Sequence, residues 1–280
     1  MEQIDVIKRL IARYPMICSS QVQLKDILNA FENGKIASLI GVEGGHTINN
    51  SLAVLRTFYD SGVRYLTLTH NCNTAWAESA LTFEKNSTID EVEGLTDFGE
   101  LVIGEMNRLG MLVDLSHTSD RTVNDALAVA AAPVIFSHSS ARELCNSSRN
   151  VPDDILKKVK RNGGVVMVNF YPNFLTCSDN ATIYDVIDHI NHIRNVTGVD
   201  HVGLGSDFNG ISKVPEGLED VSKYPNLFAE LLLDPSWTKD DLKKLAGLNF
   251  LRVFRLVESV KNVLNGEAPI ENKMAEDMKK

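Results

Sequence analysis

The stretch IASLIGVEGGH, residues 36–46, is an apolar run that ends in polar residues, and this pattern recurs along the chain. Five of its first seven residues are apolar, and the run then meets a carboxylate, Glu43, two glycines and His46. A short apolar run of this kind is typical of a strand that is buried on both faces. The charge at its end therefore predicts that the strand leaves the interior at a polar site, and that Glu43 belongs to that site.

Five further runs repeat this pattern along the chain. Each is too short for a helix, most are rich in Val, Ile, Leu or Thr, and each finishes at or beside a polar residue. With the first run, they cover residues 38–43, 65–70, 111–117, 133–138, 164–170 and 201–208. Their polar ends are Glu43, His70, His117, His138, Asn169 and Asp207. Because the carboxyl ends of parallel strands meet on one face, this ordered set predicts a single functional site.

Helix patterns separate these runs. Thr96 and Gly110 delimit one amphipathic stretch, Pro152 and Gly163 delimit another, and residues 242–264 predict one last helix. This alternation favours an α/β fold with a parallel sheet, and the polar strand ends favour a TIM-like (β/α)8 barrel. Six runs instead of eight mean that two strands are cryptic or absent. An open doubly wound sheet is the alternative, but the chain has no glycine-rich phosphate-binding motif to support it.

Composition narrows the classes of partner and location. The chain has 28 Lys and Arg residues against 37 Asp and Glu, a net charge of −9, and no basic run, which argues against a nucleic-acid partner. No stretch approaches the roughly 18 apolar residues of a membrane helix. Five Asn-x-Ser/Thr sequons and four cysteines without metal-binding spacing favour a secreted glycoprotein, although no signal peptide opens the chain. The sequons begin at Asn49, Asn86, Asn146, Asn180 and Asn195.

The strand-end residues offer the ligand chemistry of a hydrolytic zinc site. Two imidazoles, His117 and His138, could bind one Zn²⁺ ion. Glu43 could bridge to a second metal ion, and Asp207 could bind that ion or transfer a proton. Two metal ions about 3.5 Å apart can hold a shared hydroxide and polarise a carbonyl together.

In these and neighbouring stretches the chain resembles the membrane (renal) dipeptidases, a family of zinc metallopeptidases with a barrel fold. The matching stretches are ASLIGVEGGH, YLTLTHNCNTAWA, LVDLSH, PVIFSHSSAR, SRNVPDD, VMVNFY, GLGSDFNG and VPEGLEDVSKYP. They span nearly all of residues 1–260, in the family's order and spacing. The resemblance implies hydrolysis of dipeptides, including those with a D-residue at the C-terminal position, through a metal-bridging hydroxide.

The resemblance also implies a role for each matching strand-end residue. Glu43 is similar to the bridging carboxylate, and His117 and His138 are similar to the two imidazole ligands of one zinc ion. Asp207 is similar to the acidic group beside the other zinc ion, where it carries a proton. His70 is similar to the histidine that hydrogen-bonds the scissile carbonyl and stabilises its developing oxyanion.

Other matches concern the substrate pocket and the cysteines. Arg149 resembles the residue that holds the free C-terminal carboxylate of the substrate, and Tyr171 lines the same pocket. Cys145 and Cys177 match a disulfide pair of the family. Cys72 matches a cysteine whose partner lies upstream of this sequence.

The chain departs from the family at the start of the barrel. The family's first strand ends in His-x-Asp, both zinc ligands, and this sequence contains no His-x-Asp. We therefore expect an amino-terminally truncated copy that lacks the first two strands, with a barrel domain over 1–265 and a polar tail over 266–280. One zinc ion would keep Glu43, His117 and His138, whereas the second would keep only Glu43 and Asp207. This predicts one well-liganded site and impaired activity.

Two alternatives stay open at this stage. One is a catalytically inactive, dipeptidase-like surface protein that keeps the barrel for binding. The other is a related amidohydrolase with one metal ion, which does not explain Arg149 as a carboxylate clamp. For the family, the resemblance implies the extracellular face of the cell membrane, a lipid (GPI) anchor and disulfide-linked homodimers. Neither an anchor signal nor a cysteine after Cys177 is visible here.

Some residues are expected to lie outside the chemistry. His46 is interpreted as a strand-exit residue that makes a backbone hydrogen bond. His189 and His192 are interpreted as surface residues of a crossover helix. Trp76 is expected to wall the substrate pocket, with simple packing in a loop as the alternative.

Overall fold

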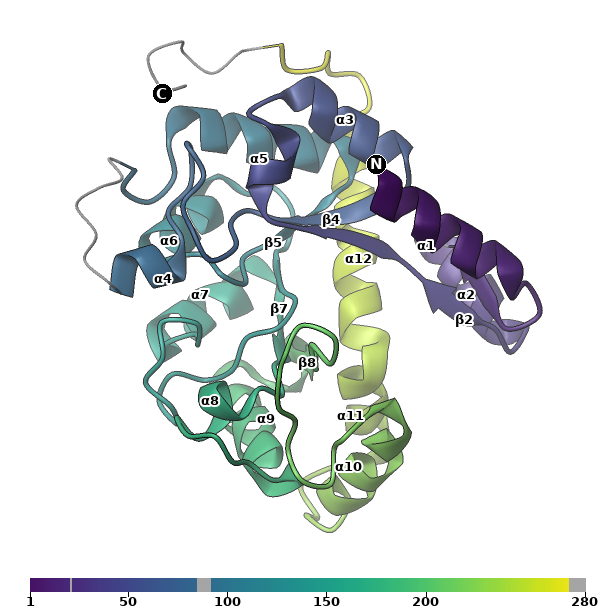
Figure 1. Ribbon diagram of the computed structural model, residues 1–280, viewed down its shortest axis with the longest axis vertical. Coiled ribbons are helices and arrows are strands. Elements are labelled where there is room, and N and C mark those ends of the chain that lie inside the picture. Colours follow the sequence, from purple (N-terminus) through teal and green to yellow (C-terminus); the bar gives the residue numbers. More distant parts are fainter. Residues whose placement is uncertain (21, 85–91, 272–280) are drawn as a thin grey trace.

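Six parallel strands form the central sheet of the computed structural model, which describes residues 1–20, 22–84 and 92–271 (Figure 1). They lie side by side in chain order, as the apolar runs predict. The strands are β3 (Ile40–Glu43), β4 (Val63–Thr67), β5 (Leu112–Asp114), β6 (Ile135–Phe136), β7 (Val165–Val168) and β8 (Val202–Leu204). Each is shorter than its predicted run, so most of the polar residues lie in the loops just beyond the strands.

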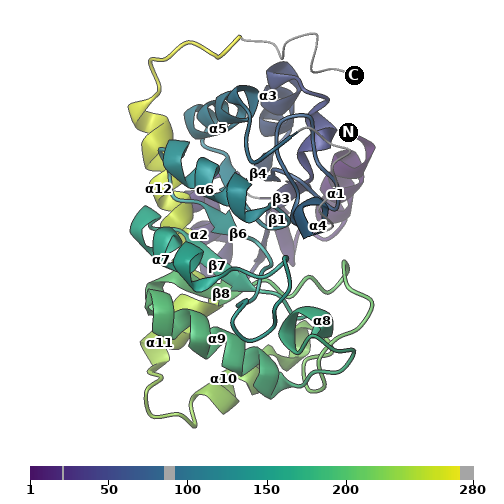
Figure 2. The same ribbon diagram turned by 90° about the vertical axis from the view of Figure 1, so that its left-hand side faces the viewer.

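Five helices connect successive strands and cover one face of the sheet. They are α3 (Leu52–Asp60), α5 (Asp97–Leu109), α6 (Asp120–Val129), α7 (Asp153–Asn162) and α9 (Ile183–Thr197), and Figure 2 shows them in succession from α3 to α9. Alternate strand residues such as Leu66, Val113 and Val166 are buried against this layer in one hydrophobic cluster. Burying these side chains contributes on the order of 2 kcal/mol each.

The predicted ends of two of these helices are confirmed. The Thr96 hydroxyl accepts a hydrogen bond from the Gly99 N–H at the start of α5, and Gly110 ends that helix with φ +80°. Pro152 precedes α7, and Gly163 ends it with φ +86°. Both glycines adopt the left-handed backbone conformation that closes a helix at little steric cost.

The helix predicted over residues 242–264 is wrong as a single element. Helix α11 (Lys239–Lys243) is followed by a π turn, η4 (Lys244–Leu248), and then by α12 (Asn249–Val263). Gly247 leaves helical geometry inside η4, and the local pattern of apolar residues did not reveal this break.

Helix α12 packs against the sheet on the face opposite the connecting helices. Its residues Val253, Phe254 and Val257 form a second hydrophobic cluster with the first residues of β5, β6 and β7, namely Leu112, Ile135 and Val165. Leu24 and Ile27 of α2 (Leu24–Glu32) belong to the same cluster. The sheet is therefore buried on both faces near the amino ends of its strands, which leaves the carboxyl ends for polar residues.

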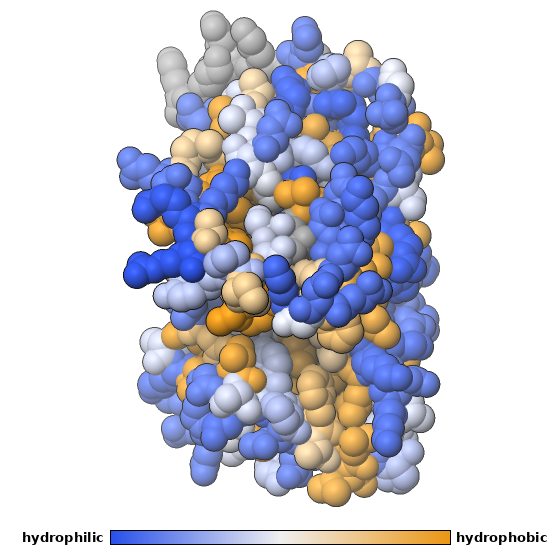
Figure 3. Space-filling view, turned by 90° about the vertical axis from the view of Figure 1, so that its right-hand side faces the viewer, coloured by the Kyte–Doolittle hydropathy of each residue, from blue (hydrophilic) through white to orange (hydrophobic). Residues whose placement is uncertain are grey.

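The first 38 residues form an arm that projects from the sheet (Figure 1). It contains α1 (Glu2–Arg13), α2 and a separate two-stranded parallel sheet of β1 (Cys18–Ser20) and β2 (Ile36–Ser38). Hydrophobic side chains are interspersed with hydrophilic ones on the face shown in Figure 3. Among the large hydrophobic residues that the arm exposes are Leu10, Met16, Ile17, Phe31 and Ile36.

The remaining elements are short. They are α4 (Ala80–Glu84), α8 (Pro172–Leu175), α10 (Tyr224–Leu231) and the single turns η1 (Gly45–Ile48), η2 (Val199–His201) and η3 (Val221–Lys223). Ile270, which falls in the predicted tail, is held by Arg56 and Glu105, while residues 272–280 lie outside the described part of the chain. None of the helices in the described ranges has the length and apolarity needed to cross a bilayer.

Candidate metal centre

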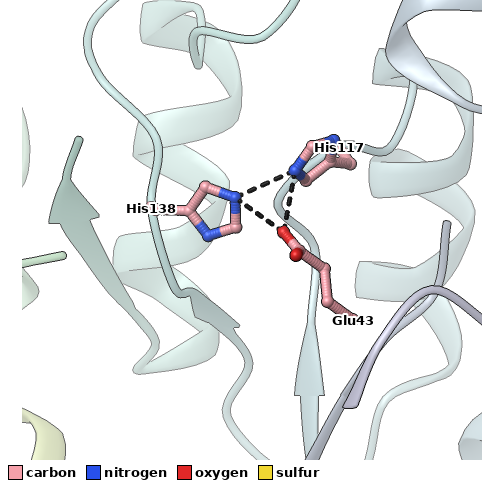
Figure 4. A group of neighbouring side chains, drawn as sticks. All are labelled: Glu43, His117 and His138. Carbon is pink, nitrogen blue, oxygen red and sulfur yellow. Dashed lines mark hydrogen bonds and ion pairs between the residues drawn. The ribbon is translucent and has the colours of Figure 1, made fainter. Parts of the chain in front are cut away.

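Three of the predicted ligands converge on one point at the carboxyl ends of the strands (Figure 4). The Glu43 Oε1 atom lies 3.0 Å from His117 Nε2 and 3.1 Å from His138 Nε2. The two Nε2 atoms are 2.9 Å apart. Both imidazoles are buried, whereas the Glu43 side chain is 43% exposed, so the group opens to solvent on one side only.

Local backbone features hold these side chains in place. Gly44 follows Glu43 with φ +107°, and a Cβ atom on Gly45 would lie 2.4 Å from the Leu68 carbonyl oxygen. His117 itself has φ +68°, a left-handed conformation that costs a non-glycine residue on the order of 1 kcal/mol or more. The Ala80 N–H donates to the His117 carbonyl at 2.8 Å and so fixes this turn. The two glycines thus serve the turn and its packing.

The electrostatics of the group favour the protonation state that a metal ion requires. Hydrogen bonds from His117 and His138 hold the pKa of the Glu43 carboxyl far below its usual range. Burial is the main reason why the pKa of His117 falls to about 3. Near neutral pH the group therefore contains a carboxylate and a neutral His117 imidazole, which are metal-binding forms.

The donor set fits a zinc ion. Tetrahedral zinc with ligand distances of 2.0–2.2 Å separates its donor atoms by about 3.3 Å, so the observed triangle needs to open by only a few tenths of an ångström. Three protein ligands with one open position are typical of catalytic zinc sites. In the described residues, Glu43, His117 and His138 are the only set of three such donors close enough to hold a metal ion.

Asp207 lies at the site but outside that triangle. Its backbone is left-handed, with φ +62°, and its Oδ2 atom accepts a hydrogen bond from the Asn169 side-chain amide at 3.3 Å. Burial raises the pKa of the Asp207 carboxyl, and the negative charge of Glu43 adds to the rise. His70 is also at the site, with its ring centroid 4.4 Å from that of His117.

Arg149 is a buried cation next to this group. It is only 5% exposed, and no carboxylate of the described residues lies within 4.0 Å of its guanidinium. Burial lowers the pKa of Arg149 to about 10, which leaves it charged at neutral pH. Its guanidinium carbon lies 5.2 Å from the centroid of the Phe174 ring, against which Tyr171 packs edge-on. Arg149 and Tyr171 thus lie against the same aromatic ring, and that they line one substrate pocket stays a prediction.

A disulfide bond joins the segment just before Arg149 to the segment just after α8. Cys145 is bonded to Cys177, which agrees with the pairing implied by the resemblance. Cys18 and Cys72 are free cysteines.

Asp114, Ser137 and Thr67 belong to the site although the sequence analysis missed them. The Asp114 carboxylate accepts hydrogen bonds from the Thr67 and Ser137 hydroxyls at 2.5 and 2.6 Å. The Ser137 Oγ atom lies 2.8 Å from His138 Nδ1. One signal was available, because a carboxylate inside an otherwise apolar strand, as in LVD, is costly unless it has polar partners.

Three further expectations are corrected or refined. His189, predicted at the surface, is 1% exposed: the Ala141 N–H donates to its Nδ1 at 2.9 Å, and its Nε2 lies 2.8 Å from the Leu175 carbonyl oxygen. His192 is partly exposed and pairs with Asp153. Trp76 is fully buried in the core and therefore does not wall a pocket. His46 is exposed.

The sequence of this chain is similar to those of known proteins. The sequence model of the membrane dipeptidases (peptidase family M19) matches residues 1–268. The chain is 50% identical over 276 residues to dipeptidase 3 of Mus musculus, which covers 99% of this chain and 55% of the mouse protein. It is 48% identical over 271 residues to dipeptidase 3 of Homo sapiens, covering 97% of this chain and 54% of the human protein. It thus spans about half the length of these relatives.

Solved structures share the fold of this chain. The probable dipeptidase PvdM from Pseudomonas aeruginosa has a TM-score of 0.85 at 23% identity, over 92% of this chain and 78% of that one, which shows a shared fold. A metallopeptidase from Rhodobacter sphaeroides, solved with a phosphinate mimic of the dipeptide L-Ala-D-Ala, has a TM-score of 0.78 at 27% identity, over 86% of this chain and 69% of that one. The match of the family model over residues 1–268 shows that the chain belongs to the membrane dipeptidase family, peptidase family M19.

Proposed function

We propose that the strand-end group is the centre of a zinc-dependent dipeptidase. The observation that carries this proposal is the convergence of Glu43 Oε1, His117 Nε2 and His138 Nε2 on one point. These three side chains would hold the metal ion. When bound, zinc lowers the pKa of water and polarises a carbonyl, which is the chemistry that hydrolysis of a peptide bond requires.

Arg149 is the residue that would select a dipeptide. A buried guanidinium without a carboxylate partner is costly, and a substrate carboxylate would supply that partner with paired hydrogen bonds. A longer peptide would place an amide where the carboxylate should lie. Tyr171 and Phe174 would form the apolar wall beside it.

Asp207 and His70 would act on the scissile bond. The pKa of the Asp207 carboxyl is raised by burial, which suits a group that accepts a proton and passes it to the leaving amine. His70 lies against His117 and could donate a hydrogen bond to the carbonyl oxygen as it becomes negative. Substrate would therefore meet an acceptor and a donor from separate loops.

The described ligands support one metal ion per chain. No second set of three donors lies close together in the described residues, so a second zinc ion would have at most two protein ligands there, such as Glu43 and Asp207. We propose that β3 to β8 correspond to six of the eight strands of a (β/α)8 barrel, and that a polypeptide with these residues alone hydrolyses dipeptides weakly. An inactive dipeptidase-like binding protein is the alternative.

Secretion, glycosylation and assembly are also proposals. The asparagines of four sequons, Asn49, Asn146, Asn180 and Asn195, are exposed, whereas Asn86 lies outside the described residues. We propose an extracellular glycoprotein, attached to the membrane through a lipid anchor and able to form homodimers, as implied for the family. Enzymatic removal of N-glycans from protein made in secretory cells, with a shift in its mass, tests the first point.

The experiment that tests the function combines metal analysis with substrate comparison. The purified chain is titrated with Zn²⁺ and then given a dipeptide, the same dipeptide with an amidated C-terminus, and the corresponding tripeptide. We expect one zinc ion per chain and slow hydrolysis of the free dipeptide only. Two zinc ions with rapid hydrolysis would contradict the impairment, and zinc binding without any hydrolysis would favour the binding protein.

A further inference from the structure

Asp114 is a fully buried carboxylate that lies one layer behind the proposed metal ligands. It accepts four hydrogen bonds. Its Oδ1 atom accepts from the backbone N–H groups of Ser137 and Ser116, at 2.8 and 3.2 Å. Its Oδ2 atom accepts from the hydroxyls of Thr67 and Ser137, at 2.5 and 2.6 Å. The register explains the proximity, because Thr67 pairs with Asp114, and Asp114 pairs with Ile135, two residues before Ser137.

These contacts fix the direction of the hydrogen bond between Ser137 and His138. A carboxylate can only accept, so the single proton of the Ser137 hydroxyl is directed at Asp114. Towards His138 Nδ1, 2.8 Å away, the same oxygen can then only accept. His138 must therefore carry its proton on Nδ1. Its Nε2 atom, which lies against Glu43 and His117, is then the ring nitrogen that is left for a metal ion.

We propose that Asp114 and Ser137 are positioning residues that keep a proton on His138 Nδ1 and thereby leave Nε2 as the nitrogen that a metal ion would bind. The inference rests on the proposed metal centre, because a fixed tautomer matters only if Nε2 is a ligand. Outer partners of this kind set the orientation and basicity of ligating histidines. His117 has no such partner among the described residues, since its buried Nδ1 atom makes no hydrogen bond there. The tautomer control is thus specific to His138.

The substitution Asp114→Asn reverses the chain of hydrogen bonds without changing its shape. Oδ1 holds two backbone N–H donors and must remain an oxygen, so the new amide group takes the place of Oδ2. An amide there donates to the Ser137 hydroxyl, which then turns its own proton to His138 Nδ1. His138 then carries its proton on Nε2 only, at the position that the metal ion would occupy.

The substitution Ser137→Ala has a different consequence. It removes the hydroxyl that connects Asp114 to His138. His138 Nδ1 then has no hydrogen-bond partner, and the ring is free to adopt either tautomer. Asp114 keeps three of its four donors, which limits the cost to folding. In the double variant, the amide at position 114 can no longer reach His138 through a hydroxyl. Ser137→Ala should therefore rescue Asp114→Asn, an outcome that independent structural damage cannot produce.

The test measures zinc affinity and the tautomer of His138 in the same set of variants. Affinity is determined by competition with a chromophoric chelator. The tautomer is determined in metal-free protein from the ¹⁵N shifts of histidine-labelled samples, with His138 assigned through a His138→Gln variant. Ser140→Ala is the matched control, because it removes a nearby buried hydroxyl whose bond goes to the Asn169 carbonyl instead. Ser137→Thr keeps the hydroxyl and should restore the wild-type values.

We expect zinc affinity to fall about 10-fold in Ser137→Ala and about 100-fold in Asp114→Asn, with the double variant close to Ser137→Ala. The ¹⁵N spectra should show a protonated His138 Nδ1 in the wild type and an unprotonated Nδ1 in Asp114→Asn. Additive losses in the double variant, or an unchanged tautomer in Asp114→Asn, would overturn the inference. If the wild type shows the Nδ1–H tautomer but binds no zinc, the proposed function fails while the hydrogen-bond relay stands.

Discussion

Glu105 in α5 and the strand-end group around Glu43 are two places where charged side chains are buried, and their partners differ. Glu105 is 0% exposed, and its carboxylate lies 2.9 Å from Arg56 and 2.8 Å from Arg108. It also accepts the Ile270 N–H at 3.3 Å. At the strand ends, by contrast, Arg149 has no carboxylate within 4.0 Å and His117 Nδ1 has no hydrogen-bond partner among the described residues.

The difference separates a structural ion cluster from a binding site. A buried charge that serves the fold is matched by charges and donors from the protein itself, because an unmatched one costs several kcal/mol. The strand-end group leaves a cation unmatched and aims three donor atoms at one point. Its partners are therefore expected to come from outside the chain, as a metal ion and a carboxylate. Substitutions in the structural cluster should therefore change stability, and substitutions at the strand ends should change binding.

The largest effect on stability is expected at the structural cluster. Glu105→Gln leaves Arg56 and Arg108 without their carboxylate and should lower the free energy of unfolding by about 3 kcal/mol. This is the low end for a buried pair, because both arginines are partly exposed and can be hydrated. Urea denaturation of the metal-free protein measures the change. Zinc affinity should stay at the wild-type value, and a parallel loss of affinity would show that the two clusters are not independent.

Arg149→Met should weaken substrate binding without lowering the stability of the fold. Loss of a paired, charge-assisted contact to a substrate carboxylate costs about 3 kcal/mol, which corresponds to a rise in KM of about 100-fold. The free energy of unfolding should not fall, because the substitution removes an unmatched buried cation. Kinetics with a free dipeptide and denaturation of the same sample give both values. Arg161→Met, at an exposed position of α7, is the control. A marked loss of stability with an unchanged KM would show that Arg149 stabilises the fold and does not bind the substrate.

A smaller effect is expected from the pH dependence of stability. Burial is the main reason why the pKa of His189 is lowered, so the unfolded chain binds a proton there that the folded chain does not. The free energy of unfolding should therefore fall as pH drops below about 6.5, by up to about 1.4 kcal/mol per pH unit for this group. His117 and His201 shift in the same direction. Asp185, Asp188 and His192 of the same helix also influence His189.

The variant His189→Gln isolates this contribution. Glutamine can accept from the Ala141 N–H and donate to the Leu175 carbonyl, as the histidine does, but it does not titrate. Stability curves at several pH values should be flatter below pH 6.5 than in the wild type. His192→Gln is the control on the same helix. An unchanged slope in His189→Gln would show that this histidine does not contribute.

The grouping of residues that follows from the order of the strands alone could be predicted from the sequence. The strands of a parallel α/β sheet are short apolar runs, and their carboxyl ends must meet, so Glu43, His117 and His138 could be grouped before any coordinates were known. The helix ends at Gly110 and Gly163 follow from local backbone chemistry in the same way.

Contacts that depend on strand register or on which side of a helix faces the core could not be predicted from the sequence. Asp114 contacts Ser137 only because β5 and β6 pair at Asp114 and Ile135, and a single sequence does not specify that pairing. His189 was expected at the surface because a crossover helix lies away from the carboxyl ends of the strands, yet its ring is hydrogen-bonded to the backbone at Ala141 and Leu175. The break at Gly247 likewise depends on how α11 and α12 pack.

Zinc binding by the intact chain is the most direct test of the central claim. Metal titration with X-ray absorption at the zinc edge should find one ion per chain with two imidazole nitrogens at about 2.0–2.1 Å. The Glu43→Gln variant should lose more than about 100-fold in affinity, beyond the effect of an outer partner, while Glu105→Gln binds as the wild type. A bound ion without imidazole ligands, or equal affinity in Glu43→Gln and the wild type, would contradict the account.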